Sequence, residues 1–362
     1  MRLFLKQKRL YFIGAGLIAL AITLISSRIS PNINEWYTNH IYPIFAFTIG
    51  KLTGMIPFSV AEIIIVTLPM ILAGYTIFSI IFMVKKDRGY IRKFIANALV
   101  LVSVFYGVFV LLCGVNYNRV PISETYQLEL KPRETSILIE LCGELIENTN
   151  LLKRESLLEQ GQRVTPDILK KLAKETQHAY KVLENLGILK SGYYGELKSI
   201  FFSKLMSYTN IVGFFFPYTF EANIDIDVPI YTIPATMAHE IAHLRGYMKE
   251  DEANFIAYLA CMNSENVDLQ YSGTMLALTH SLNALYKVDS HTYSQLFSFL
   301  SGDVMGDIAF NSEYWNQFDG KISEVSTKVN NSYLKSQNQH DGVQSYGKVV
   351  DLLIAEYIKR NK

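Results

Sequence analysis

The chain has few cysteines: Cys113, Cys142 and Cys261 are the only three among 362 residues. No two of them have the Cys-x-x-Cys spacing of a thiol redox or zinc motif. A disulfide between Cys142 and Cys261 is compatible with the sequence, but we favour buried free thiols, because unpaired cysteine is among the most buried residue types. Cysteine usage therefore does not identify the redox compartment.

Charge is also scarce. Charged residues make up 19% of the chain and the net charge is +1, so the sequence lacks the concentrated basic patch of a nucleic-acid-binding protein. Half of the residues are apolar and the mean hydropathy is +0.16, which is high for a soluble protein. The length is too great for one compact core, and we predict two regions joined in one chain.

Long uncharged runs occupy the N-terminal third of the sequence. Each is long enough, or nearly so, to cross about 30 Å of hydrocarbon. The first run is interpreted as a signal anchor rather than a cleaved signal peptide, because no clear cleavage site follows it. We predict transmembrane helices at about 10–28, 60–84 and 94–116.

The stretch 41–58 is less apolar than these runs, because Lys51 and Pro57 interrupt it. Runs this short seldom cross a bilayer, so we predict an interfacial or re-entrant segment here. Residues 1–118 are accordingly predicted to form a membrane domain.

Basic residues predict the orientation of this membrane domain. Four of them precede the first apolar run and five lie in the loop 85–93, whereas the segment 29–59 carries Lys51 alone among lysines and arginines. The positive-inside rule therefore places the N-terminus and the loop 85–93 in the cytoplasm. Three crossings then place residues 119–362 on the extracytoplasmic side.

Residues 119–362 are predicted to form a mainly α domain with a small β region. The aromatic and β-branched stretch 211–228 favours short strands. Apolar periodicity and start signals predict helices at about 136–148, 166–186, 235–245, 250–263, 272–287, 291–300, 306–335 and 345–360.

The sequence His239-Glu240-Ile241-Ala242-His243 is an HExxH motif. Two histidines four residues apart lie on one face of a helix, where both imidazoles can ligate one zinc ion. Glu240 then lies beside the open metal position, where it can act as general base on a water molecule. Uncharged neighbours suit a buried helix, and Gly246 is a good helix C-cap.

The third metal ligand is sought on the helix that follows. Glu250 and Asn254 form a Glu-x-x-Ala-Asn pattern, which resembles the second helix of gluzincin-like HExxH…E peptidases. The resemblance implies that Glu250 ligates zinc and that Asn254 supports a metal-ligating residue. Glu252 is the alternative ligand, and the acidic run also suits a helix N-terminus without any metal. A metzincin is excluded, because Lys249 occupies the place of its third ligand.

Three weaker features accompany the motif. Tyr247 is either a hydrogen-bond donor to the transition state or a packing anchor, and we favour the anchor. His280 is either a supporting residue of the site or structural, and we favour the structural role. The strands predicted in 211–228 either offer an edge to an extended substrate or form ordinary core.

Several runs resemble an uncharacterised family of bacterial multi-pass membrane proteins. The resemblance covers nearly the whole chain and implies a metallopeptidase-like domain after the membrane segments, with no substrate attached to it. The runs that carry it are 114–119 (GVNYNR), 216–219 (FPYT), 239–247 (HEIAHLRGY), 250–255 (EDEANF) and 341–347 (DGVQSYG).

Together these patterns predict a zincin-like, membrane-anchored zinc metallopeptidase of the bacterial envelope, with one Zn²⁺, a peptide or protein substrate and no nucleic-acid partner. The alternative is a catalytically silent metal-binding sensor or assembly protein. An intramembrane protease is disfavoured, because no apolar run of about eighteen residues encloses the motif.

Overall fold

The computed structural model describes residues 2–26, 30–86, 88–193, 195–336 and 347–362. Residues 341–346 of the last family-like run lie outside this described part, and so do the first two residues of the helix predicted at 345–360. The described chain is mainly helical, as predicted.

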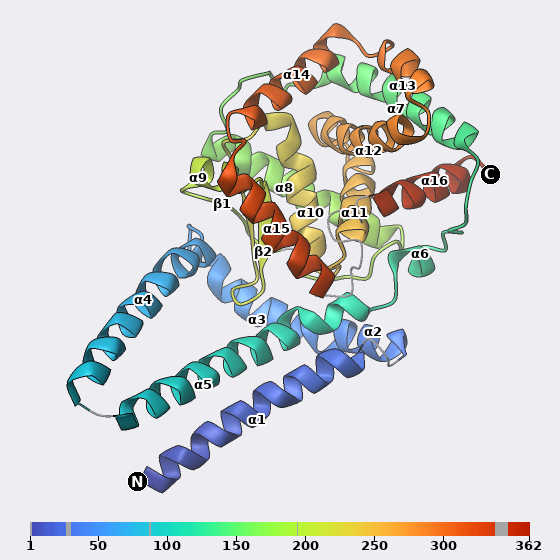
Figure 1. Cartoon of the computed structure of the whole chain (residues 1–362). Coiled ribbons are helices and arrows are strands. Elements are labelled where there is room, and N and C mark those ends of the chain that lie inside the picture. The colour runs from blue at the N-terminus through green and yellow to red at the C-terminus, as the bar shows by residue number, and fades with distance from the viewer. Residues whose placement is uncertain (1, 27–29, 87, 194, 337–346) are drawn as a thin grey trace.

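Five long helices form the N-terminal part, in which α1 and α5 run side by side while α4 projects away from the rest of the chain (Figure 1). Small residues permit the close approach of α1 to α5, because a Cβ on Gly16 would lie 2.5 Å from the Cβ of Ser103. The five helices are α1 (Arg2–Ser26), α2 (Pro31–His40), α3 (Tyr42–Gly54), α4 (Val60–Lys86) and α5 (Arg88–Leu112).

Two helices of the described chain are long and apolar enough to cross a membrane. They are Val60–Phe82 within α4 and Ile91–Leu112 within α5, and only 6% and 11% of their apolar windows are buried. A core helix of a soluble protein would be mostly buried. In α1 the apolar part is shorter, Leu10–Ile22, so the first of the three predicted crossings stays a prediction.

The segment predicted to be interfacial forms α3, which has two different faces. Tyr42, Ala46 and Gly50 are buried, whereas Ile44 and Phe47 on the other face are exposed. The Tyr42 hydroxyl donates a hydrogen bond to the carbonyl of Leu244 at 2.9 Å. Contacts therefore cross the predicted domain boundary at residue 118, and the membrane location of α3 stays a prediction.

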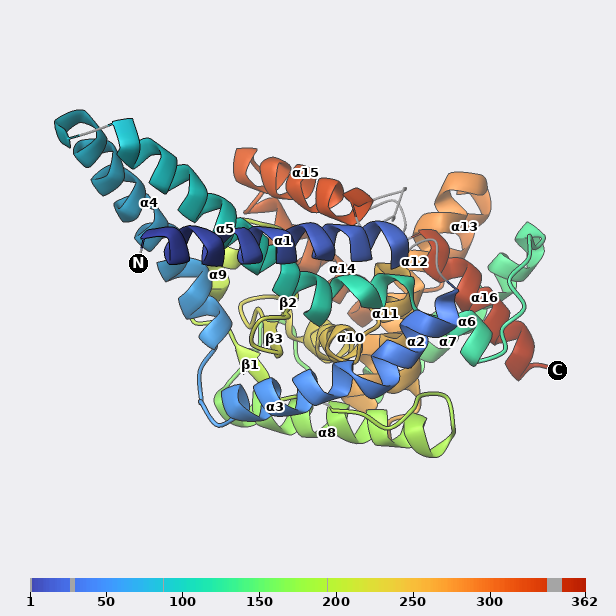
Figure 2. The same ribbon diagram turned by 90° about the horizontal axis from the view of Figure 1, so that it is seen from below.

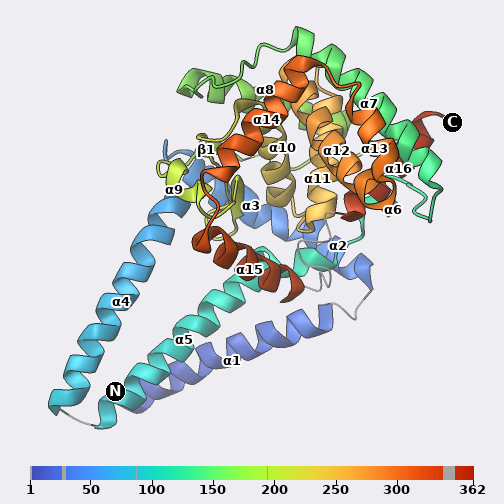
Figure 3. The ribbon, with the colours of Figure 1, turned by 45° about the horizontal axis from the view of Figure 1, so that its top comes forward.

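Residues 113–362 surround a central group of three helices, α10, α11 and α12, with α7, α8, α13, α14 and α16 around it (Figure 3). The elements of this part are η1 (Gly114–Asn118), α6 (Ile122–Thr125), α7 (Thr135–Glu155), α8 (Pro166–Asn185), β1 (Leu197–Ser199), α9 (Ser203–Ser207), β2 (Gly213–Phe216), β3 (Glu221–Ile224), η2 (Ile230–Thr232), α10 (Ile233–Leu244), α11 (Glu250–Met262), α12 (Val267–Val288), α13 (Ser290–Phe297), α14 (Gly302–Asn316), α15 (Lys321–Ser336) and α16 (Lys348–Arg360).

The strands form one small sheet in the order β1-β3-β2. β1 is parallel to β3, with Leu197 opposite Ala222, and β2 is antiparallel to β3, with Phe215 opposite Ala222. The short strands predicted within 211–228 are present as β2 and β3, although β3 ends at Ile224. β1 was not predicted, because three residues carry no readable alternation.

The single helix predicted at 306–335 is wrong. The chain forms α14 and α15 instead, and it turns between them at Asp319-Gly320, a residue pair that favours turns. The Gly320 amide donates to the Ser323 hydroxyl at 3.1 Å, which starts the second helix. This turn directs α15 back toward α5 (Figure 2).

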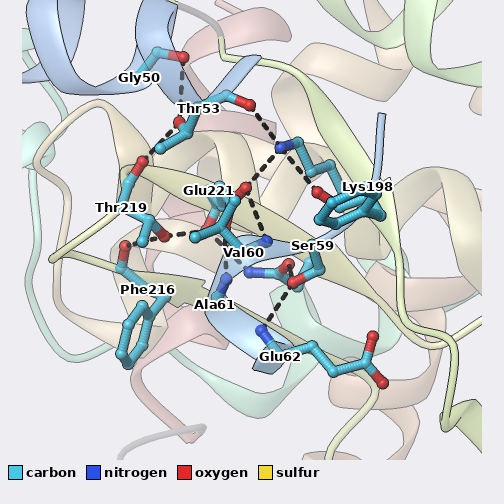
Figure 4. Close-up of polar contacts among 12 residues, drawn as sticks. Gly50, Thr53, Ser59, Val60, Ala61, Glu62, Lys198, Phe216, Thr219 and Glu221 are labelled. Carbon is cyan, nitrogen blue, oxygen red and sulfur yellow. Dashed lines mark hydrogen bonds and ion pairs between the residues drawn. The ribbon is translucent and has the colours of Figure 1, made fainter. Parts of the chain in front are cut away.

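A buried ion pair joins the sheet to the start of α4 (Figure 4). Lys198 of β1 lies 2.5 Å from Glu221 of β3, and both side chains are at least 95% buried. The Glu221 carboxylate also accepts from the backbone amides of Val60 and Ala61, while Lys198 donates to the carbonyl of Thr53. A carboxylate at a helix N-terminus satisfies amides that have no partner within the helix.

Candidate metal centre

The HExxH motif lies on α10, as predicted, and this helix is almost completely buried. Pro234 stands in its first turn, where the missing amide hydrogen costs nothing. His239 and His243 lie on the same face, with ring centroids 4.5 Å apart. The uncharged residues of the motif are therefore needed for packing, while the two imidazoles face a cleft.

A Schellman turn ends α10 and returns the chain to the metal site. Gly246 has a φ of +86°, and its amide donates to the carbonyl of His243 at 2.9 Å. The Tyr247 amide donates to the carbonyl of Ala242 at 3.0 Å. These two bonds define a Schellman motif and confirm the predicted C-cap at Gly246. The next helix, α11, begins at Glu250.

Glu250 brings its carboxylate to both imidazoles. One of its oxygens lies 3.1 Å from Nε2 of His239 and the other lies 3.6 Å from Nε2 of His243. Donor atoms of the three residues all lie within 4.8 Å of one another. Two ligands at about 2.0–2.1 Å from a tetrahedral zinc ion stand roughly 3.3 Å apart, so this donor set has the chemistry and the spacing of a zinc site.

The far nitrogens of both rings are held by oxygen atoms. Nδ1 of His239 lies 2.9 Å from Oδ1 of Asn254, and Nδ1 of His243 lies 2.8 Å from the carbonyl of Tyr247. Because an oxygen acceptor requires a proton on Nδ1, each Nε2 is the ring atom whose lone pair a bound metal can use. Asn254 thus lies in the supporting position that the resemblance to gluzincin-like peptidases implies.

Glu252, the alternative third ligand, lies apart from this cluster. Its side chain is buried, and the nearer carboxylate oxygen is 3.4 Å from the ammonium of Lys249. Burial raises the pKa of Glu252, against the effect of the Lys249 charge. Among the described residues, the geometry therefore favours Glu250 over Glu252.

Glu250 and His243 have shifted pKa values within this cluster. Burial alone would raise the pKa of Glu250, but the charges and hydrogen bonds of His243 and His239 outweigh burial and lower it. Burial alone would lower the pKa of His243, but the Glu250 carboxylate raises it to about 9. Such mutual attraction is what a metal cation replaces when it binds between these groups.

Glu240 lines the same cleft as the two histidines. Burial raises its pKa, although His239 and His243 oppose the rise. One carboxylate oxygen is buried without a hydrogen-bond partner in the described chain. A Cβ on Gly213 of β2 would lie 2.8 Å from the other oxygen, so only glycine permits the strand to pass so close.

The cleft has a volume of about 480 Å³ and is bounded by elements that are distant in the sequence. β2, an edge strand of the sheet, forms one wall with Gly213, Phe214 and Phe215. α14 and α15 contribute Trp315 and Asn330.

Two tyrosines in the cleft were not predicted. The Tyr117 hydroxyl of η1 donates to the Tyr333 hydroxyl of α15 at 3.0 Å. Tyr117 lies within the family-like run 114–119, which was the available signal for it. Tyr333 had no signal, because only the turn before α15 brings it to the site.

Tyr247 and His280 differ in their placement. The Tyr247 ring packs on the Arg119 guanidinium, 3.8 Å from ring centroid to Cζ, and is not among the described residues that line the cleft. The Tyr247 side chain is therefore a packing anchor, as favoured from the sequence, while its backbone carbonyl accepts a hydrogen bond from Nδ1 of His243. His280 does line the cleft, and burial together with the nearby His239 lowers its pKa to about 4.

Comparison with known proteins identifies a family. The family model described as "Protein of unknown function (DUF3810)" matches residues 37–354, a span that includes both apolar helices and every residue of the candidate centre. No curated protein and no solved structure matches the chain.

Proposed function

Because the chain belongs to the DUF3810 family, whose description names no function, we propose its activity from the site itself: a membrane-anchored zinc metallopeptidase. The observation that carries the proposal is the convergence of His239, His243 and Glu250 within 4.8 Å, in the cleft that also holds Glu240. A zincin-like core is part of this proposal.

His239, His243 and Glu250 would hold the zinc ion, and Asn254 would keep the ring of His239 in place. When bound, zinc supplies a Lewis acid and lowers the pKa of a water molecule to near neutrality. Glu240 accepts a proton from the attacking water and returns it to the leaving amine. The raised pKa of Glu240 suits this double role, because a carboxyl group both accepts and returns a proton most readily when its pKa is close to the working pH.

The walls of the cleft suit a peptide substrate. β2 pairs with β3 on one side only, so its other edge can accept an extended peptide as an added strand. Tyr333 and His280 carry hydrogen-bond donors in the same cleft and can bind the reacting carbonyl oxygen. The lowered pKa keeps His280 a neutral donor at pH 7.

We propose three membrane crossings, formed by α1, α4 and α5, with the N-terminus in the cytoplasm. The lysines and arginines before α1 and between α4 and α5 support this orientation. The metal centre then lies on the extracytoplasmic side of a bacterial membrane.

The test is metal content and peptide cleavage of the full-length protein in lipid nanodiscs. We expect about one zinc ion per chain, loss of zinc in His239→Ala, and retained zinc with at least a hundredfold loss of cleavage in Glu240→Gln. Glu250→Gln should lose zinc, whereas the matched variant Glu252→Gln should keep it. A chain without stoichiometric metal would overturn the proposal. Full zinc without cleavage of a peptide library would favour the silent metal-binding protein.

A further inference from the structure

The helix α15 carries three aliphatic residues on the outer side of the molecule. Ile322, Val325 and Val329 follow one another at spacings of three and four, so they form one stripe along the helix. Their exposed fractions are 61%, 58% and 64%. Nothing in the described chain covers this stripe.

The inner side of the same helix is polar. Ser323 is buried, Ser326 and Asn330 are partly buried, and Asn330 lines the cleft of the metal centre. A surface helix of a soluble domain has the opposite arrangement, with its apolar face toward the core. The polarity of α15 is therefore reversed, which indicates that its apolar stripe has an apolar partner outside the chain.

Lysines flank the stripe on one side. Lys321, Lys328 and Lys335 are spaced by seven residues, so they fall on one side of the helix, and all three are exposed. Glu324 is the single acidic residue of α15. An apolar stripe beside a row of lysines is typical of helices that lie in the interface of an anionic bilayer, where lysine ammonium groups reach the phosphates.

The position of α15 beside the end of α5 agrees with a location at the bilayer interface. Its Tyr333 ring packs against Phe109 of α5 with centroids 6.3 Å apart. Phe109 lies three residues before Leu112, where the apolar span of α5 ends. A span ends where hydrocarbon gives way to headgroups, so Tyr333 stands at the interface. Figure 3 shows the C-terminal end of α15 close to the C-terminal part of α5.

We propose that α15 is an interfacial helix that inserts Ile322, Val325 and Val329 into the lipid and forms the membrane-facing rim of the cleft. Lipid fits better than a second copy of the chain, because the lysine row repels another copy of itself and attracts anionic headgroups. The next step rests on the proposed peptidase function: the substrate is a membrane-attached polypeptide that is cut near the bilayer surface.

Lipid contact is tested by labelling α15 with an environment-sensitive fluorophore at Val329→Cys and, as the matched control, at Thr327→Cys. Thr327 is also exposed but lies away from the stripe, and the three native cysteines are buried. Each protein is placed as a single copy in nanodiscs that contain anionic lipid. Quenching is measured with headgroup-proximal spin-labelled lipid and with aqueous iodide.

We expect lipid to quench the label at position 329 several-fold more than the label at 327, and iodide to show the reverse order. Equal quenching at both positions would overturn the proposal. So would protection of position 329 that appears only at high protein concentration in detergent, because this result would identify a second copy as the partner.

The substrate step is tested with Val329→Glu and the matched variant Thr327→Glu, neither of which alters a cleft residue. Losing the burial of one valine should lower kcat/KM for a lipid-anchored peptide roughly tenfold in Val329→Glu, with kcat/KM for the soluble peptide unchanged. An equal loss on both peptides would contradict the membrane-attached substrate. If the wild-type protein cleaves neither peptide, the peptidase proposal fails, while the quenching experiment still decides whether α15 lies in lipid.

Discussion

Asn254 and the carbonyl of Tyr247 decide how the two imidazoles face the candidate metal. Each oxygen accepts the Nδ1 proton of one ring, so both Nε2 atoms are directed toward Glu250. The side chain of Asn254 can be removed by mutation, whereas a backbone carbonyl cannot. A substitution can therefore test the oxygen that orients His239, but not the oxygen that orients His243.

We expect Asn254→Ala to weaken zinc binding by about 10- to 100-fold, because the ring of His239 loses the bond that orients it. A competition titration with a fluorescent chelator measures the affinity. Asn361→Ala is the control, since Asn361 is exposed and distant from the site in sequence. Equal affinities in the two variants would mean that Asn254 has no role in orienting His239.

Zinc affinity should rise with pH up to about 9. Without metal, the Glu250 carboxylate raises the pKa of His243 to about 9, so zinc has to displace a proton below that pH. One proton displaced per ion gives roughly a tenfold gain per pH unit between about 6.5 and 9. His280→Ala should keep this slope, because the lowered pKa leaves His280 neutral throughout the range. A flat affinity profile would contradict the coupling.

The same two groups make the stability of the metal-free protein depend on pH. The raised pKa of His243 contributes stability that is fully present below about 6.5 and is lost as the pH rises through about 9. The lowered pKa of Glu250 contributes stability that is lost as the pH falls below its ordinary value of about 4.3.

Gly213→Ala should abolish cleavage but spare zinc. The new Cβ would lie 2.8 Å from a Glu240 oxygen and 2.9 Å from Cγ2 of Thr236, so the strand or the carboxylate has to move. Gly143→Ala is the matched control, because no atom lies within 4 Å of its Cβ position. Full activity in Gly213→Ala would show that the position of Glu240 tolerates this displacement.

At the scale of elements, the ion pair between Lys198 and Glu221 anchors α4 to the sheet. We expect Glu221→Gln to cost about 3–5 kcal/mol, because it leaves the buried ammonium of Lys198 without a counter-charge. Glu129→Gln removes an exposed pair with Lys131 and should have little effect on stability, because water screens an exposed ion pair. Thermal unfolding in detergent compares the two, and similar losses would argue against the anchor.

The helices themselves were largely predictable, but only some of their ends were. The boundaries of α10 and α11 agree with the prediction to within two residues, because HExxH periodicity, Gly246 and the acidic first turn all act locally. By contrast, α14 and α15 share a continuous helical pattern that obscured the turn signal of Asp319-Gly320, and the contact of Tyr333 with Phe109 depends on that turn. Local pattern cannot show such a contact.

At the scale of the whole molecule, the number of crossings decides where the termini lie. Two crossings by α4 and α5 place both termini on one side, whereas three place them on opposite sides. The packing of α1 along α5 through Gly16 and Ser103 favours three. We expect reporter fusions to locate the N-terminus in the cytoplasm and the C-terminus outside it. Termini on the same side would remove α1 from the set of spans.

By itself, the sequence determined the HExxH helix, its two histidines and the apolar helices α4 and α5. Each depends on spacing within one element, and such spacing is set by the geometry of a single helix. The tertiary structure placed Glu250, and not Glu252, beside the two imidazoles. Two residues apart on a helix, they point to nearly opposite sides, and only the packing of α11 against α10 shows which side meets the imidazoles. It also brought α15 and its tyrosine to the cleft, because contacts between distant segments depend on the whole fold.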